Sequence, residues 1–424
     1  MKQNILNTLA TKFFSGIVNL LLIIFTTQFL GAEGKGEIGI FVLNLTVILM
    51  ASDIIGGAGL IYVVPRSDIF KIAVSSYAWA IFVSVFSVLL FYMFHFTESK
   101  FLMDLFLLSI LLNISTVNSN ILVAKEKINL SNFLSLIQII IQVSAFSFLI
   151  FYQEKKEIGL YIFSLYLSYG ICVLLGIYLI KLQMISFSFS GLFTAFKKMF
   201  QYGIFVQLGN FIQLLNYRLS YYLLEHFHGA GAVGIYSTGT SLAEAVWLIS
   251  NSVARVQYAR ISNSSDISYS QNLSIRLSKI TLLTTIAALL PLIFLPGKFY
   301  ILILGNGFAD VKTVVITLFI GVCSFGLTSM YSHYFSGTGK VYINTIASFF
   351  GLIFTLIFGF ILIPQISFMG AGITASISYF ASSVFLTFYF LKDTKISAVH
   401  LIPSFFDIRF FIAETKKIII FNRK

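Results

Sequence analysis

The stretch FLGAEGKGEIGIF, residues 29–41, places four glycines and three charged residues between two long apolar runs. A stretch of nearly the same form, HFHGAGAVGIY at residues 226–236, occurs later in the chain. Glycine is the residue that most readily allows a tight, close-packed chain reversal. Each stretch therefore predicts a sharp turn between two apolar helices, and the echo predicts that the chain repeats itself.

The composition indicates a membrane protein. The chain has 424 residues, of which 58% are hydrophobic and 10% are charged, whereas soluble domains are roughly a quarter charged. A spanning helix needs about 20 apolar residues, so the chain has room for about a dozen spans. The first apolar run is too long for a signal-peptide core and predicts a retained helix. Cys172 and Cys323 lie inside apolar runs, which argues against a disulfide framework.

Hydropathy predicts an all-α integral membrane protein with about 12 transmembrane helices. Their expected bounds are 9–30, 38–64, 70–96, 101–124, 128–152, 158–180, 200–226, 231–258, 273–296, 311–336, 341–363 and 368–391.

The basic residues predict the orientation. With the N-terminus in the cytoplasm, most of the 28 Lys and Arg residues fall on the cytoplasmic side, as the positive-inside rule requires. Both termini are then expected in the cytoplasm. The net charge of +12 is mainly a signal of topology, and no nucleic-acid partner is expected.

The echoed turns divide the chain into two pseudo-symmetric halves. Residues 1–180 are expected to form an N-terminal six-helix bundle and residues 200–391 a C-terminal one, joined by a cytoplasmic linker at 181–199. Residues 392–424 are expected to form a basic amphipathic tail on anionic lipid. Six helices per half is an even number, so the halves should be related by an axis along the membrane normal, with a cavity between them.

Three motifs carry a resemblance to a known family. They are the LG…G.G..G.F pattern from Leu30, the GAGAVGIYS stretch at 229–237, and GTGKVYINTIASFFGLIFTLIFGFILIPQISFMGAGITASISYFAS at 337–382. Together they resemble the Wzx-type flippases of O-antigen and capsule repeat units, in the MATE-like MOP superfamily. That family often carries Arg before the first LG, where this chain has Thr27 and Gln28.

The resemblance implies a V-shaped transporter in the bacterial inner membrane and no enzymatic activity. It would move undecaprenyl-pyrophosphate-linked oligosaccharide from the cytoplasmic to the periplasmic leaflet by alternating access, for O-antigen, lipopolysaccharide or capsule synthesis. Membrane lipid, a glycan polymerase and a chain-length regulator are the partners that it implies.

Polar residues form stripes along several predicted helices. At about 100° per residue, one side of the helix at 200–226 is polar and the other apolar. Similar stripes follow helices 9–30 and 231–258. A single stripe can hold two helices together, but matched stripes in both halves favour a wet cavity. The substrate-binding residues expected on these stripes are Lys12, Asn19, Gln207, Asn210, Tyr217, Arg218, Tyr221, Asn251 and Arg255.

The charges within the spans are the sharpest signal, because a charge at the bilayer centre costs roughly 2.5–3.5 kcal/mol on insertion scales. Arg218 could bind a phosphate through its planar fork, or form an ion pair with Glu244. Lys12 could attract pyrophosphate or extend to the cytoplasmic interface. Asp53 and Glu244 could carry a coupling proton or sodium ion, or serve as structural counter-ions. Tyr217 and Tyr221 could stack on sugar rings or simply pack.

No cofactor is expected beyond a coupling proton or sodium ion. His226 and His228 lack a third metal ligand, and no GxxxxGK[ST] nucleotide loop is present. Three alternatives remain. The first is a cation-coupled multidrug exporter, which should prefer an acidic site to one containing Arg218. The second is a glycan polymerase or ligase, which would need a large outer loop. The third is a flippase for a lipid-linked peptidoglycan precursor, which typically has two further helices.

Overall fold

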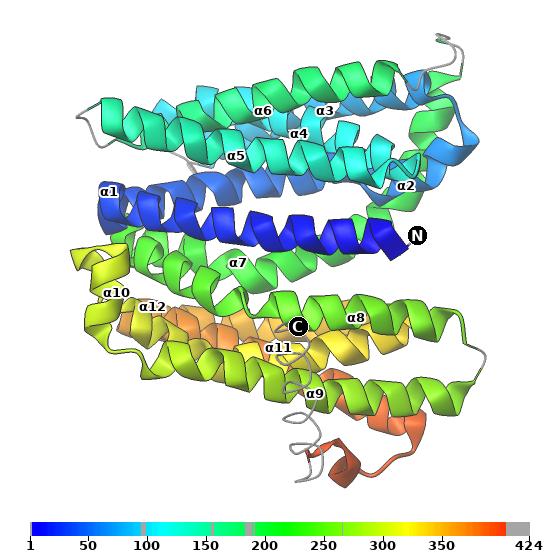
Figure 1. Cartoon of the computed structure of the whole chain (residues 1–424), viewed down its shortest axis with the longest axis vertical. Helices are drawn as coiled ribbons and strands as arrows, with labels where there is room; N and C mark the ends of the chain where they lie inside the picture. The colour runs from blue at the N-terminus through cyan, green and yellow to red at the C-terminus, as the bar shows by residue number, and fades with distance from the viewer. Residues whose placement is uncertain are drawn as a thin grey trace, which may run out of the picture. The chain divides into compact units, whose positions relative to one another are not determined.

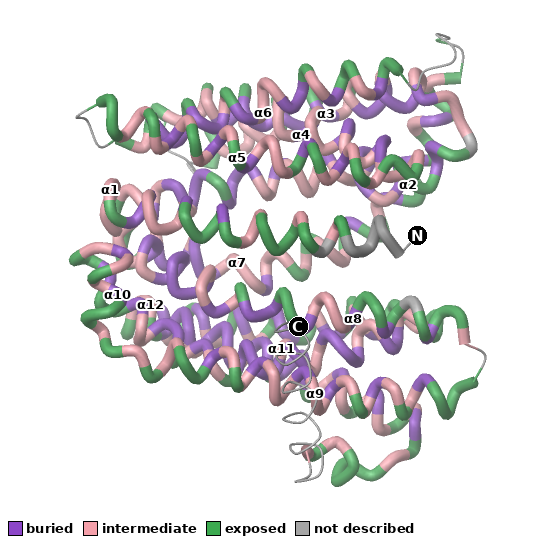
Figure 2. Tube along the Cα trace, viewed as in Figure 1, coloured by how far each residue is buried: buried purple, intermediate pink, exposed green. Residues whose placement is uncertain are grey.

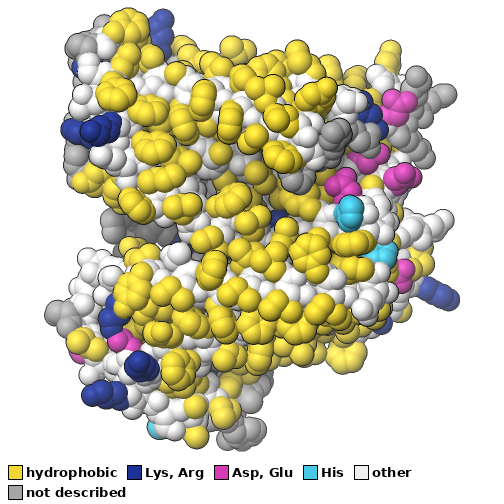
Figure 3. Space-filling view, turned by 180° about the vertical axis from the view of Figure 1, so that it is seen from behind, with side chains coloured by type: hydrophobic (Ala, Val, Ile, Leu, Met, Phe, Trp, Pro, Cys, Tyr) yellow, Lys and Arg dark blue, Asp and Glu magenta, His cyan; other side chains and the backbone are white. Residues whose placement is uncertain are grey.

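The computed structural model describes residues 2–94, 99–153, 157–182, 189, 191–264 and 266–403 (Figure 1). These residues are almost entirely helical and contain no strand, so the all-α prediction is confirmed. Eight of the described segments are long and apolar enough to cross a membrane. Hydrophobic side chains cover much of the face shown in Figure 3, and most of the charged side chains on that face lie toward its left and right edges.

Several predicted helices are joined without an intervening loop. The segments Ala10–Val63 and Tyr342–Thr394 have 54 and 53 residues, each enough for two crossings of about 20 residues. The glycine-rich stretch at 29–41 was expected to be a loop, but the helix bends there at a single residue. Gly31 has φ 68° and ψ −171°. Gly229, at the same place in the second stretch, has φ 76° and ψ 177°.

These two bends explain why glycine stands at both positions. A positive φ with an extended ψ is a conformation that only glycine adopts without strain. The third bend has no glycine at its centre and uses Ile366 and Ser367, the latter at φ 50° and ψ −132°.

The chain divides into two compact units, and each is described separately. The first contains Met1–Phe211 together with Ile303–Gly305. Its elements are α1 (Lys2–Gly56), α2 (Ala58–Val63), η1 (Val64–Arg66), α3 (Ile69–Met93), η2 (Ser99–Phe101), α4 (Leu102–Ala124), α5 (Ile128–Tyr152), α6 (Ile158–Lys181) and the first part of α7 (Leu192–Glu244). In this unit α5 packs on α6, and α4 packs on α3 and α6. A core of Ile48, Leu105 and Phe146 is fully buried between them.

The second unit contains Ile212–Leu302 and Asn306–Lys424. After the rest of α7 its elements are α8 (Trp247–Ser262), α9 (Ile267–Phe294), α10 (Gly297–Leu304), η3 (Asn306–Phe308), α11 (Val311–Gly337), α12 (Tyr342–Thr394) and η4 (Ala398–Leu401). Helix α11 packs on α12, α9 and α8 and is largely buried (Figure 2). Small residues allow this closeness: the position of a Cβ on Gly372 lies 2.0 Å from Thr317 Oγ1.

Three features differ from the sequence-based expectation. The spans expected at 38–64 and 231–258 are each interrupted, the first at Gly57 between α1 and α2, the second at residues 245–246 between α7 and α8. The linker expected at 181–199 is already helical from Leu192, where α7 begins. The short helix α10 was not predicted. Residues 183–188 and 190 of the linker and 404–424 of the tail lie outside the described residues, and the boundaries of the two predicted halves stay a prediction.

Candidate functional site

Helix α7 carries most of the residues that the sequence marks as substrate-binding. The boundary between the two compact units falls within this helix, between Phe211 and Ile212. Gln207 and Asn210 therefore belong to the first unit, and Tyr217, Arg218 and Tyr221 belong to the second. The helical periodicity predicted one continuous polar face for these five residues. The structure divides them into two groups, one in each unit.

An ion pair between Arg218 and Glu244 is the centre of the second group. Arg218 Nη2 donates to Glu244 Oε2 at 2.7 Å, and Arg218 Nη1 donates to Glu244 Oε1 at 3.0 Å. Two parallel bonds of this kind form the bidentate geometry that a guanidinium and a carboxylate favour. The side chains are 29% and 13% exposed, so the pair is only partly shielded. Of the two roles that the sequence left open for Arg218, the ion pair is the one formed in this structure.

Tyr221 also contacts Arg218. Arg218 Cζ lies 5.3 Å from the centroid of the Tyr221 ring, which is within the range of a cation–π contact. The Tyr221 hydroxyl also lies 3.4 Å from Arg218 Nη1 and 2.9 Å from Thr240 Oγ1. Tyr221 is 6% exposed, so its ring is a wall of the site rather than an open surface.

Tyr217 belongs to an aromatic cluster beside this pair. Its ring centroid lies 5.8 Å from that of Trp247, 6.2 Å from Phe325 and 5.1 Å from Tyr379. Trp247 and Phe325 stack with centroids 3.9 Å apart. The Tyr217 hydroxyl accepts a bond from Gln213 Nε2 at 2.9 Å. Tyr217 is half-buried, and Tyr379 is buried at 3% exposure.

Sequence reasoning missed Thr240 as a partner of Tyr221 and the other three rings of the cluster. Trp247 is one of two tryptophans in the chain and lies three residues after Glu244, so its rarity and position were a usable signal. Phe325 and Tyr379 come from α11 and α12, far along the sequence. Phenylalanine and tyrosine are so frequent in this chain that neither position stands out, and only the folded structure brings these rings together.

In the first unit, Asp53, Gln207 and Asn210 form the other group. Gln207 Nε2 donates to the backbone oxygen of Asp53 at 3.2 Å, and Asn210 Nδ2 donates to Gln207 Oε1 at 3.0 Å. The same Asp53 oxygen accepts from Gly57 N at 3.0 Å, at the break between α1 and α2. The Asp53 carboxylate is half-buried and forms no ion pair with any described residue. A structural counter-ion for Asp53 is therefore missing from the described part of the chain.

The remaining predicted residues lie on α1 and α8. Lys12 and Asn19 are exposed on α1 in the first unit. Asn251 is half-buried and Arg255 exposed on α8 in the second unit. Their assignment to substrate stays a prediction.

The imidazole of His228, beside the bend at Gly229, has a structural contact. Its Nε2–H donates to the backbone oxygen of Ile363 at 2.7 Å, which ties α7 to α12. Among the described residues, no group of three or more His, Cys, Asp or Glu side chains is arranged to hold a metal ion.

The fold of this chain is similar to the folds of solved membrane transporters of the MOP superfamily. A lipid II flippase MurJ in an inward closed conformation aligns over 92% of this chain and 88% of its own, with a TM-score of 0.73 and 15% identity. An inward-facing MATE multidrug transporter of the MOP superfamily aligns over 91% of this chain and 96% of its own, with a TM-score of 0.70 and 14% identity. Identities this low establish the fold and not the cargo.

Two proteins are similar to this chain in sequence. The capsular polysaccharide biosynthesis protein CapF of Staphylococcus aureus is 25% identical over 264 residues, covering 59% of this chain and 64% of CapF. An uncharacterized membrane protein of Methanocaldococcus jannaschii is 27% identical over 202 residues, covering 46% of this chain and 39% of that protein. The match thus spans less than two thirds of either relative. No family model matches the chain.

Proposed function

We propose that the chain is a flippase for oligosaccharides linked to polyprenyl pyrophosphate, and that it moves its cargo across the membrane without making or breaking a bond. The Arg218–Glu244 pair is the observation that carries the proposal. Both residues lie in segments that the sequence predicts to span the membrane, where a charge is expensive to keep. A guanidinium also binds phosphate oxygens with the same two-pronged geometry as it binds a carboxylate.

The pair suggests how cargo would be bound and released. At rest, Glu244 occupies the guanidinium and keeps the site close to neutral. An arriving pyrophosphate would compete with Glu244 for Nη1 and Nη2, and the displaced carboxylate would then need a cation or a proton. Glu244 therefore links substrate binding to ion coupling. Asp53, which has no ion-pair partner among the described residues, is the second candidate coupling site.

The relatives favour a saccharide cargo. CapF carries polysaccharide biosynthesis in its name, and MurJ is named for lipid II. A capsule repeat unit fits the sequence match to CapF, whereas O-antigen would give the same transport chemistry with a different glycan. We place the protein in the bacterial inner membrane with both termini in the cytoplasm, where it would supply a glycan polymerase and chain-length regulator.

Export of glycan by cells that lack their own flippase tests the proposal. The wild-type chain should restore surface glycan, and Arg218→Ala should abolish export while the protein still inserts. Lys198→Ala is the matched control, because it removes an exposed charge from the same helix, and it should export normally. Full export by Arg218→Ala would remove Arg218 from the mechanism.

A multidrug exporter is the second candidate, favoured by the MATE-like fold and by the Asp53 carboxylate, which has no ion-pair partner in the part of the chain that the structure describes. Resistance to cationic drugs should be measured in the same cells. Drug resistance that depends on Asp53 and persists in Arg218→Ala, with no glycan export, would select the exporter over the flippase.

A further inference from the structure

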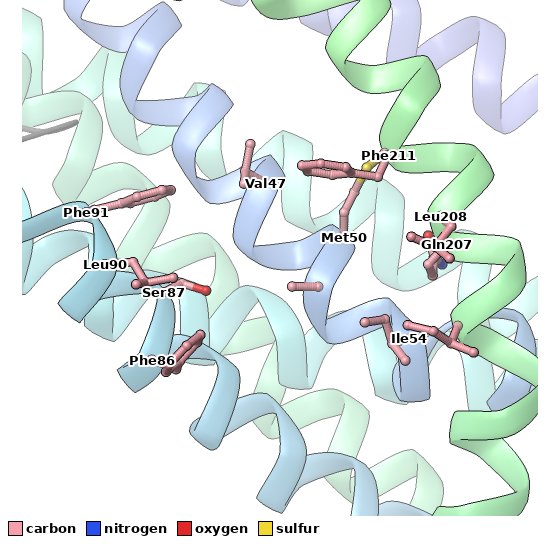
Figure 4. A pocket seen from close by; sticks show the side chains of 12 residues that line it. Val47, Met50, Ile54, Phe86, Ser87, Leu90, Phe91, Gln207, Leu208 and Phe211 are labelled. Carbon is pink, nitrogen blue, oxygen red and sulfur yellow. The ribbon is translucent and has the colours of Figure 1, made fainter. Parts of the chain in front are cut away.

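An apolar groove lies in the first unit, between α1, α3 and the first part of α7 (Figure 4). Its volume is about 300 Å³. Its lining residues are Val47, Met50, Ala51, Ile54, Phe86, Ser87, Leu90, Phe91, Ile204, Gln207, Leu208 and Phe211. All are apolar except Ser87 and Gln207. None of the polar or aromatic contacts that surround Arg218 is part of this groove, so it is a separate feature.

One of the two polar lining residues, Gln207, is already hydrogen-bonded within the protein. Both ends of the Gln207 amide are already bonded within the protein, Nε2 to the Asp53 oxygen and Oε1 to Asn210. Each end of the Gln207 amide thus already has one hydrogen-bond partner inside the protein. An amide that is already bonded at both ends costs less to cover with an apolar group than an amide with no partner.

The groove is also open at its rim. Phe86, Leu208 and Phe211 are 54%, 52% and 39% exposed, although all three lie on apolar helices of a membrane protein. In lipid, such a surface attracts nothing by hydrophobicity alone, because hydrocarbon already covers it. A specific occupant must gain by shape and dispersion contacts, which favours a chain that fills the groove better than a straight acyl chain does.

We propose that this groove holds a segment of the polyprenyl tail of the lipid-linked cargo. A polyprenyl chain carries a methyl branch on every isoprene unit, so it is thicker and less flexible than an acyl chain. The rings of Phe86, Phe91 and Phe211 and the adaptable Met50 side chain line the groove and can pack around the methyl branches of such a chain through dispersion contacts. The assignment rests on the proposed function, in which the cargo carries a polyprenyl tail.

The seated tail would also contact the helix break that carries Asp53. Met50, Ala51 and Ile54 lie within the last turns of α1 before Gly57, and Gln207 joins α7 to the Asp53 backbone at the same place. The tail site and a candidate coupling site thus share one wall of α1.

Photolabelling tests the proposal without glycan and without transport. The probe is a polyprenyl phosphate with a diazirine on its tail, added to the purified chain in phospholipid nanodiscs. Labelled peptides should come from residues 47–54, 86–91 and 204–211. Ser87→Trp should fill the groove and lower labelling there by about tenfold. Val85→Trp is the matched control, since Val85 is exposed on the same helix and does not line the groove, and its labelling should stay within about twofold of the wild type.

Ala51→Leu fills the groove from the opposite wall and keeps the test valid if Ser87→Trp does not fold. Unlabelled polyprenyl phosphate should compete for the site, and a straight-chain alkyl phosphate should not. Labelling spread over other helices, equal labelling of the filled variants, or equal competition by the alkyl phosphate would overturn the proposal. Because no glycan is present, failure of the groove and failure of the flippase function remain distinguishable: a chain that flips cargo but shows no groove labelling loses only this inference.

Discussion

At the scale of single residues, the Arg218–Glu244 pair matters because both partners depend on each other. The two bonds of 2.7 and 3.0 Å offset the cost of taking two charges from water, and removing one partner leaves the other charge uncompensated. The pair is therefore a structural element and a candidate binding site at once. A competing anion can bind Arg218 only by replacing the negative charge that Glu244 supplies in this structure.

A double-mutant cycle should detect this dependence. Arg218→Ala and Glu244→Ala are each expected to lower the free energy of unfolding in detergent by about 2–3 kcal/mol, since each leaves a poorly hydrated charge unpaired. The double variant should lose less than the sum, with an interaction of roughly 0.5–3 kcal/mol. Arg255→Ala, at an exposed position, is the control and should change stability by no more than about 0.5 kcal/mol. Additive losses would show that the pair contributes no coupling.

The two bends give a second prediction at this scale. Gly31→Ala and Gly229→Ala should each destabilise the protein by about 1–3 kcal/mol, because alanine is strained at φ 68° and φ 76°. The strain, and not crowding, is the cause, since a Cβ at either position meets nothing within 4 Å. Gly159→Ala, equally uncrowded but in ordinary helical conformation near the start of α6, should be neutral or slightly stabilising. Thermal unfolding of the three variants measures the difference.

At the scale of elements, glycine also sets how closely α7 approaches α1 and α2. A Cβ on Gly203 would lie 1.7 Å from the backbone oxygen of Ile54, and one on Gly59 would lie 2.4 Å from that of Met199. These contacts fix the break at Gly57 against α7. The same contacts position Gln207 on the Asp53 backbone, so the polar group of the first unit depends on them.

Gly203→Ala should therefore lower the yield of folded protein severely, because a backbone atom cannot give way to the new methyl group. Gly170→Ala on α6 is the control, since nothing lies within 4 Å of its Cβ position, and it should be tolerated. Size-exclusion chromatography of detergent extracts compares the two. A normal monodisperse yield of Gly203→Ala would mean that α7 is not held at this distance.

Elements that depend on local sequence could be predicted, whereas contacts between distant helices could not. Apolar runs of the length of a bilayer predicted the spans, and the third to sixth agree with α3 to α6 within a few residues. The break after Gly56 had a signal in its paired glycines, but the break at residues 245–246 has none. Phe325 and Tyr379, the partners of Tyr217 on α11 and α12, were not predictable, because contacts between distant helices leave no mark on the periodicity of either helix.

At the scale of the whole molecule, the sequence predicts the orientation of the chain in the membrane, with both termini in the cytoplasm. The fold alone does not test this prediction. Cysteine labelling on intact cells can test it. Gln153→Cys, after α5, should react with a membrane-impermeant maleimide, and Lys127→Cys, before α5, should react only after permeabilisation. Both positions are exposed. The native thiols of Cys172 and Cys323 are buried and should contribute little background. The reverse pattern would invert the topology.

The central claim is that the chain moves polyprenyl-pyrophosphate-linked oligosaccharide from one leaflet to the other through a site that includes Arg218. Reconstitution into liposomes tests it most directly, with leaflet-specific digestion of the glycan as the readout. The account predicts that wild-type liposomes make the inner-leaflet cargo accessible, while Arg218→Ala liposomes remain at the level of protein-free liposomes. Wild-type liposomes that do not differ from protein-free ones would contradict the account.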